Sequence, residues 1–214
     1  MRLIGVLVAT AVVVGACSSE TGGDPAAEEP GVPDPSVVGV VETTRRPLEP
    51  KSQTCDAPER PAGAQAVSFV QGGKPGTPVV TIMMPDTWTS AVTQNDSTMT
   101  LTGPAGLTGT LTVSPSELGA AEAFEKYADD ITATSPTSSV SAQPGELCGY
   151  SGQKLTGVVS ANGGPPVEYR DRIAHVWTNG PSYLIAIRVE GPQGDAALSE
   201  AADLILGDIG IRLP

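Results

Sequence analysis

Three strand-length segments near the C-terminus, separated by short turns, constrain the fold more than any other feature of the sequence. They span residues 152–163, 167–180 and 182–191. The turns between them read NGGPP and TNGPS, and Asn, Gly and Pro favour tight reversals of the chain. Because consecutive strands joined by such turns pair antiparallel, this region predicts a three-stranded meander.

Apolar alternation predicts further strands upstream of the meander. In segment 77–85, Val80, Ile82 and Met84 fall on one face. Segments 97–103 and 107–114 alternate apolar residues with threonines and are separated by the turn sequence GPAG. These two segments therefore predict a hairpin.

Two helices are predicted, one before the meander and one near the C-terminus. We expect Ser116 to be the N-cap of the first helix and Asp195 the N-cap of the second. The apolar residues that recur at helical spacing in the first are Leu118, Ala121, Phe124, Tyr127 and Ile131. The order of strands, helix, strands, helix and a final short strand predicts an α+β domain, an antiparallel β-sheet flanked by helices.

The N-terminus has the pattern of an export signal. One basic residue, Arg2, precedes an apolar run that is shorter than the roughly 20 residues of a membrane-spanning helix. The run ends in Val-Gly-Ala-Cys, which is similar to a bacterial lipobox. We therefore expect residues 1–16 to be a lipoprotein signal peptide and Cys17 to carry a diacylglycerol with acyl chains such as palmitate. The alternative is an ordinary secretory signal with a coincidental cysteine.

The other two cysteines, Cys55 and Cys148, are left as a pair once Cys17 is assigned to lipid. Disulfides persist in the oxidising compartments that exported proteins reach. A bridge across this long loop stabilises a fold by roughly 4 to 5 kcal/mol. A redox or metal site would need a second cysteine nearby, and the single histidine, His175, is distant in sequence. We predict a structural disulfide.

Composition divides the chain into a tether and one domain. Residues 17–52 are rich in Pro, Gly and acidic residues without an apolar period, so we expect a disordered tether that includes the apolar run 37–41. Residues 53–214 are expected to form a single folded domain. The 24 acidic and 12 basic residues give a net charge of −12, which argues against nucleic acid as a partner.

Candidate catalytic and metal sites are few. Asp171 and His175 share a strand face, and a hydrolase would need a serine beside them. The residues Glu168, Arg170 and Arg172 on the opposite face predict a solvated surface or a partner contact. No sequence pattern indicates a cofactor, and the pair at 129–130 lacks the spaced acids of a calcium loop.

One block resembles a known family. The segment GKPGTPVVTIMMPDTW (73–88) resembles the Pro-Gly-x-Pro, apolar strand and Pro-Asp/Glu-x-Trp block of the mycobacterial LpqN/LpqT-type lipoproteins. The later helix, the YLIAIRV strand and the terminal ILGDIGI follow in matching order. The resemblance implies a Mog1/PsbP-like α/β/α sandwich. It also implies a cell-envelope protein with a glycolipid-like ligand or a lipid-transporter partner, and Met83 or Trp88 are candidates to line an apolar groove.

These observations leave three hypotheses. The first is a non-enzymatic extracytoplasmic lipoprotein, anchored to the cell membrane at Cys17, that binds an apolar or glycolipid ligand or an envelope lipid-transport partner. The second is a structural or protein-interaction module of the envelope without a ligand. The third is a hydrolase that uses Asp171 and His175. A cavity near Trp88 would favour the first hypothesis, and a close-packed interior would favour the second.

Overall fold

The computed structural model describes residues 37–41, 47–49, 53–57, 59–73, 76–94, 97–133, 135, 137–160 and 164–213. The signal peptide expected at 1–16 and the lipid attachment expected at Cys17 lie outside these residues. Within the described ranges, no helix combines the length and apolar character needed to cross a membrane.

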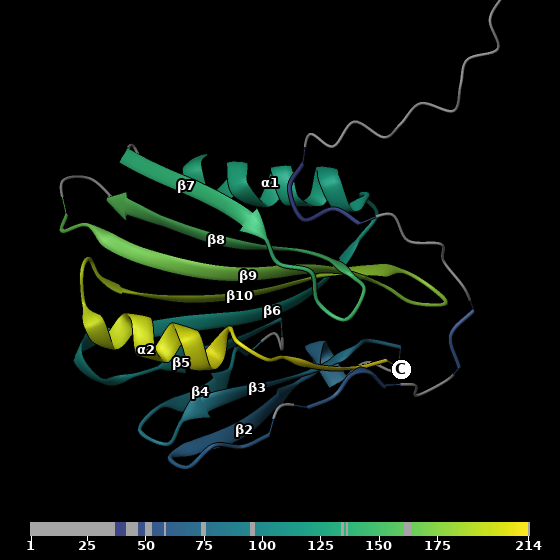
Figure 1. Ribbon diagram of the computed structural model, residues 1–214, viewed down its shortest axis with the longest axis horizontal. Coiled ribbons are helices and arrows are strands. Elements are labelled where there is room, and N and C mark those ends of the chain that lie inside the picture. The colour runs from purple at the N-terminus through teal and green to yellow at the C-terminus, as the bar shows by residue number, and fades with distance from the viewer. Residues whose placement is uncertain are drawn as a thin grey trace, which may run out of the picture. The chain divides into compact units, whose positions relative to one another are not determined.

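Two antiparallel sheets form the framework of the described part of the chain (Figure 1). The seven-stranded sheet has the order β4-β5-β6-β10-β9-β8-β7. Its strands are β4 (Thr89–Val92), β5 (Thr98–Thr102), β6 (Thr108–Ser116), β7 (Thr137–Pro144), β8 (Ser151–Ser160), β9 (Val167–Trp177) and β10 (Ser182–Pro192). The four-stranded sheet has the order β1-β11-β3-β2, and its strands are β1 (Gln53–Cys55), β2 (Ala64–Phe69), β3 (Val79–Pro85) and β11 (Gly210–Arg212).

The predicted strand pairings are confirmed. Strands β8, β9 and β10 form the antiparallel meander, and β5 and β6 form the hairpin. In β3, the side chains of Val80, Ile82 and Met84 are all buried. The difference from the prediction is that the strands divide between two sheets rather than one, because β3 pairs with β2 and β11 instead of joining the meander.

Helix α1 (Ala120–Ala133) begins later than the sequence suggests. The prediction that Ser116 is its N-cap is wrong, because Ser116 is the last residue of β6 and pairs with Ser182 in β10. The strand ladder continues through this position and so excludes a helical start. The helix instead begins after Gly119, whose backbone N–H donates to the Glu122 carboxylate at 3.3 Å, one half of a capping box.

Helix α2 (Ala196–Ile205) follows the prediction closely. Asp195 is its N-cap, and its carboxylate accepts a hydrogen bond from the Ala197 backbone N–H at 2.9 Å. The buried face consists of Leu198, Ala201, Ala202 and Ile205. Spacing of three and four residues therefore identified the correct face.

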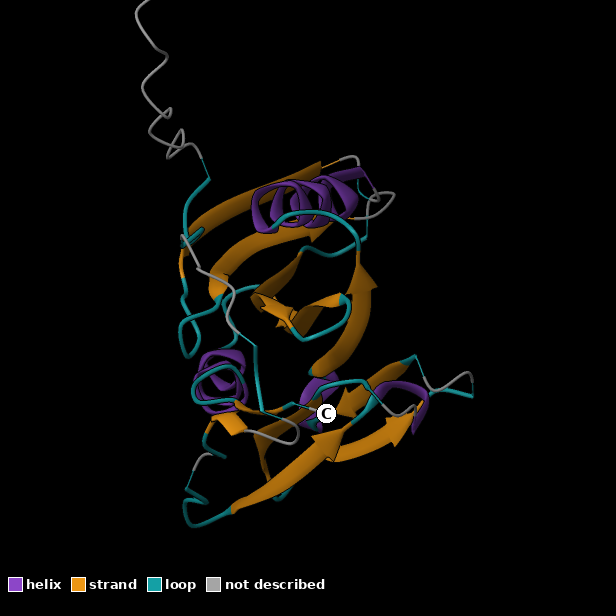
Figure 2. Cartoon of the chain, turned by 90° about the vertical axis from the view of Figure 1, so that its right-hand side faces the viewer, coloured by secondary structure: helices purple, strands orange, loops and turns teal. Residues whose placement is uncertain are grey.

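The two faces of the seven-stranded sheet are covered differently. Helix α1 packs on one face, where Phe124 meets Leu155, Ile173 and Ala186. The four-stranded sheet and α2 pack on the other face, which holds the main core of residues such as Ile82, Val113, Ile185, Ile187 and Leu198 (Figure 2). The α+β class with antiparallel strands and two helices is thus confirmed within the described residues.

Parts of the expected tether are hydrogen-bonded to the domain. The Gly152 N–H donates to the Gly39 carbonyl at 2.9 Å, and the Gln153 side chain donates to the Val38 carbonyl at 2.8 Å. Gly39 has φ +77°, and a Cβ on it would meet the Gly152 carbonyl oxygen, so only glycine permits this approach. Farther along, Leu48 exchanges two backbone hydrogen bonds with the Asn179 side chain, at 2.8 and 2.6 Å. The folded body therefore includes 37–41, which the prediction placed in the tether.

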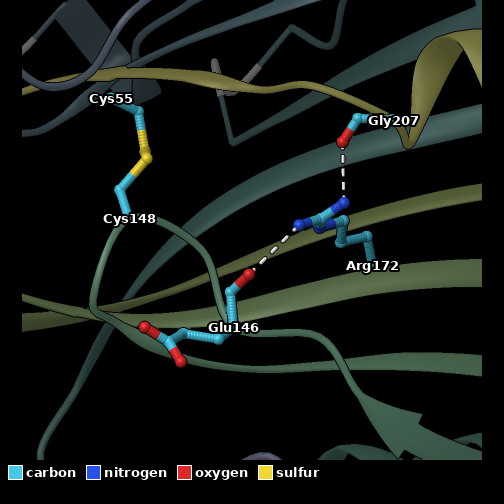
Figure 3. Close-up of a disulfide and its surroundings, with 5 residues drawn as sticks. All are labelled: Cys55, Glu146, Cys148, Arg172 and Gly207. Atoms are coloured by element: carbon cyan, nitrogen blue, oxygen red, sulfur yellow. Dashed lines mark hydrogen bonds between the residues drawn. A yellow bond between two sulfur atoms is a disulfide. The ribbon is translucent and has the colours of Figure 1, made fainter.

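The predicted disulfide between Cys55 and Cys148 is confirmed, with a Cα–Cα distance of 5.6 Å (Figure 3). It joins the short edge strand β1 to the loop between β7 and β8. Of the two bridged residues, Cys55 is buried and Cys148 is exposed. The bridge therefore holds the smaller sheet to the larger one.

Candidate functional site

A groove of about 520 Å³ lies between α1 and the β6 and β10 part of the seven-stranded sheet. Helix α1 lies mainly over β7, β8 and β9, and in β10 it leaves Leu184 half-buried. The apolar lining consists of Pro115, Leu118, Ala123, Tyr127, Leu184 and Ala186, and the hydroxyl lining includes Thr112, Ser114 and Ser116.

The floor of the groove comes from the alternation of β10. Leu184 and Ala186 face α1, whereas Tyr183, Ile185 and Ile187 point into the main core on the other side. A strand that is apolar on both faces, as YLIAIRV is, must be covered on both faces. Because α1 covers only part of this face, the remaining apolar surface of β10 forms a groove.

A threonine-rich face continues the sheet beyond the groove. Thr98, Thr100 and Thr102 of β5 lie directly opposite Thr112, Thr110 and Thr108 of β6. On the other side of β6, Thr112 pairs with Ala186 and Ser114 with Leu184. Hydroxyl groups and the apolar floor therefore lie side by side on one surface.

A buried ion pair adjoins the inner end of the groove. The Arg188 guanidinium donates two hydrogen bonds to the Asp171 carboxylate, at 2.8 and 2.7 Å. The Tyr127 hydroxyl donates to the same carboxylate at 3.0 Å. Tyr127 belongs to α1, the helix beside the groove. The guanidinium carbon lies 4.4 Å from the centroid of the Tyr169 ring, a favourable cation–π distance.

Burial sets the protonation of this cluster. It raises the pKa of the Tyr127 hydroxyl far above its usual value, and the nearby Asp171 charge adds to the effect. Tyr127 is therefore a neutral donor at physiological pH. Burial also raises the pKa of the Asp171 carboxyl, whereas the hydrogen bonds from Arg188 oppose that change.

Asp171 and His175, the candidate hydrolase pair, each have other hydrogen-bond partners in the structure. Both oxygens of Asp171 are engaged by Arg188 and Tyr127. The Nε2 atom of His175 lies 3.0 Å from the Leu118 carbonyl oxygen. Ser151 is the cross-strand neighbour of His175, but its hydroxyl accepts a hydrogen bond from the Val41 backbone N–H at 3.0 Å. The structure therefore gives Asp171 a partner other than His175.

The charged face of β9 is only partly solvated, because α2 lies against it: the Arg170 and Glu168 side chains remain 29% and 25% exposed. Arg172 donates to the carbonyls of Leu206 and Gly207, at 3.0 and 2.7 Å, just beyond the C-terminus of α2. It also donates to the Glu146 carbonyl at 3.3 Å, in the loop that carries Cys148 (Figure 3). A cation is favourable at a helix C-terminus, so Arg172 fastens α2 to the disulfide loop.

The two sequence candidates for ligand binding have core positions. Trp88 is 3% exposed, and its ring lies against Gly103, where a Cβ would meet it at 2.3 Å. Met83 is 4% exposed. Neither residue lines the groove. The groove residues Leu184, Ala186 and Ala123 were missed, although the two-sided apolar character of β10 was a readable signal.

The acidic pair at 129–130 includes a residue of the candidate site, because Asp130 and Lys126 both line the groove at exposed positions. Asp130 forms an exposed ion pair with Lys126 at 3.0 Å, one helical turn away. Within the part of the chain that the structure describes, no group of three or more His, Cys, Asp or Glu side chains is placed to hold a metal ion.

No protein-family model matches the chain. No curated protein sequence matches it either. Among solved structures, it is similar to the crystal structure of LpqN, described as involved in cell envelope biogenesis of Mycobacterium tuberculosis. The TM-score is 0.52 at 20% sequence identity, over 71% of this chain and 92% of LpqN. The chain therefore has an LpqN-like fold, as the sequence resemblance implied.

Proposed function

We propose that the chain is an envelope lipoprotein, anchored to the cell membrane through Cys17, whose domain binds an amphiphilic ligand of the glycolipid class in the groove beside α1. The lipobox-like sequence supports the anchor, and the disulfide fits an oxidising compartment. The fold is similar to that of LpqN, a protein described as involved in envelope biogenesis. Helices on both faces of the larger sheet also fit a Mog1/PsbP-like sandwich.

The ligand proposal depends on one observation: an apolar groove lies directly beside a hydroxyl-rich face of the same sheet. The groove volume of about 520 Å³ lies within the usual range of small-molecule sites, about 300 to 1,000 Å³. An acyl chain would cover Leu184 and Leu118, which removes apolar surface from water. A sugar head group would then lie over the neighbouring threonines, whose hydroxyls both donate and accept hydrogen bonds.

The proposal assigns no catalytic step to the domain, because Asp171 is held by Arg188 and Tyr127. A membrane protein that transports lipid is the partner class that would supply or receive such a ligand.

Native mass spectrometry of the chain extracted from its own envelope in mild detergent tests the proposal. The expected result is an added lipid mass. The variant Ser114→Trp places a large ring in the groove from an exposed position and is expected to lose most of that mass. Ser90→Trp, on the exposed edge strand β4, is the matched control and is expected to retain it, because Ser90 pairs with Leu101 and lies on the other face of the sheet. An apo mass in the wild-type chain, or equal loss in both variants, contradicts the proposal.

A further inference from the structure

The segment 37–41, the first that the structure describes, fixes where the chain that follows Cys17 joins the domain. The Val41 N–H donates to the Ser151 hydroxyl at 3.0 Å, and the Gly39 carbonyl accepts from Gly152 at 2.9 Å. Val37 packs on the cluster beneath α1 that contains Phe124. The segment therefore lies beside α1, on the same side of the sheet as the groove (Figure 1). Counted from Cys17, the tether is then 20 residues, 17–36, instead of the 36 residues, 17–52, that the sequence suggested.

Exposed apolar side chains gather at this exit. Among the described residues, the large hydrophobic side chains classed as exposed are Val38, Val40, Leu118 and Val92. Val38 and Val40 belong to the docked segment, and their exposed fractions are 42% and 41%. Leu118, 39% exposed, lies on the rim of the groove. Only Val92 lies elsewhere, on the edge strand β4.

Hydrogen bonds connect the two parts of this apolar end. Ser151, which holds Val41, is the direct cross-strand neighbour of His175. The Nε2 atom of His175 lies 3.0 Å from the Leu118 carbonyl. The docked segment and the groove rim thus flank the same end of β8 and β9. We define the apolar exit as Val38, Val40 and Leu118.

We infer that the apolar exit lies in the interfacial layer of a lipid bilayer, with the groove opening toward the membrane. This inference rests on the proposed anchor at Cys17 and names the partner of the groove as the bilayer itself. A 20-residue chain extends at most about 70 Å, so an anchored domain stays within reach of the surface. The diacylglycerol proposed at Cys17 carries two acyl chains and holds the chain at the bilayer, so the apolar exit determines the orientation of the domain rather than whether it binds.

Charge shows which kind of membrane contact is possible. The chain carries a net charge of −12, and Glu117 adjoins Leu118 on the groove rim. Anionic head groups would repel this surface, so the contact depends on apolar side chains and not on electrostatic attraction. Its strength should therefore fall, not rise, as the anionic lipid fraction of the membrane increases.

Fluorescence quenching by lipids with brominated acyl chains tests the orientation. The full chain is purified from its envelope with its anchor and reconstituted in phosphatidylcholine vesicles. The added fluorescence of a Val40→Trp variant is expected to be quenched strongly. A Val92→Trp variant, matched in residue type and exposure, is expected to keep its added fluorescence. Equal quenching at both positions, no quenching at 40, or failure of the chain to float with the vesicles overturns the inference.

A second measurement separates this inference from the proposed function. The double variant Val38→Asp, Val40→Asp is expected to take up a glycolipid from vesicles several-fold more slowly than wild type. Its equilibrium binding of the same glycolipid from detergent micelles is expected to be unchanged. If wild type binds nothing from micelles, the ligand proposal fails, while the quenching result still decides the orientation. Unchanged uptake from vesicles counts against the apolar exit.

Discussion

At the residue scale, two acidic side chains of the same type have opposite environments. The Asp171 side chain is fully buried against Arg188, whereas the Asp130 side chain is 65% exposed beside Lys126. Removing one partner of a buried ion pair leaves the other charge without compensation in a medium that solvates it poorly. An exposed pair keeps its hydration, so its loss has little effect.

We therefore predict that Asp171→Asn lowers the free energy of unfolding by about 3 to 5 kcal/mol, because it leaves the Arg188 charge unpaired. Asp130→Asn should lower it by no more than about 0.5 kcal/mol. Urea unfolding followed by circular dichroism measures both values. Similar losses for the two variants would show that the Arg188 pair is not the source of the difference.

The sequence drew attention to Asp171 for a different reason. Its position four residues before His175 predicted a shared strand face, and β9 does place both residues on it. The sequence did not indicate that Arg188, 17 residues later, would lie directly opposite Asp171. That pairing depends on the register of β9 against β10, which is set by the geometry of the intervening turn and not by the residues around Asp171.

At the scale of elements, the predicted N-cap of α2 is correct and the predicted N-cap of α1 is wrong. Asp195 accepts a hydrogen bond from the first turn of α2, as an N-cap does. Ser116, with the same sequence signature, is the end of a nine-residue strand instead. A local capping preference is worth about 1 kcal/mol, which a continuous strand ladder easily exceeds.

Alanine substitution at the two positions should show this contrast. Asp195→Ala is expected to lower the free energy of unfolding by about 1 kcal/mol, because the first turn of α2 loses its acceptor. Ser116→Ala should change it by less than about 0.5 kcal/mol, since Ser116 caps no helix. Chemical denaturation at matched protein concentration measures both. A larger loss at Ser116 than at Asp195 would be incompatible with the helix boundaries.

At the scale of the whole molecule, the disulfide links two parts of the chain that are far apart in the sequence. It bridges residues 93 positions apart and ties the smaller sheet to the loop that Arg172 contacts. Closing a long loop lowers the entropy of the unfolded chain.

We expect the double variant Cys55→Ser, Cys148→Ser to lose roughly 4 kcal/mol of stability, measured from its urea transition against the oxidised wild type. Unfolded, unreduced wild type should show no reaction of these two cysteines with a thiol reagent. Labelling of either cysteine under those conditions would contradict the bridge.

What the sequence determined by itself was local. The turns that divide 152–191 predicted the meander, GPAG predicted the β5–β6 hairpin, and the spacing of Leu198, Ala201 and Ile205 predicted the buried face of α2. The export context and the cysteine count predicted the disulfide. Each of these features depends on a residue and its near neighbours in the chain, or on the number of cysteines. The amino-acid sequence is therefore sufficient to predict them.

Only the tertiary structure decided the rest. It divided the strands between two sheets, placed α1 so that Leu184 remains half-exposed in a groove, and docked Gly39 on Gly152. Each of these outcomes depends on how segments up to more than 100 residues apart pack and register together. Because many arrangements satisfy the same local preferences, packing over the whole molecule selects among them.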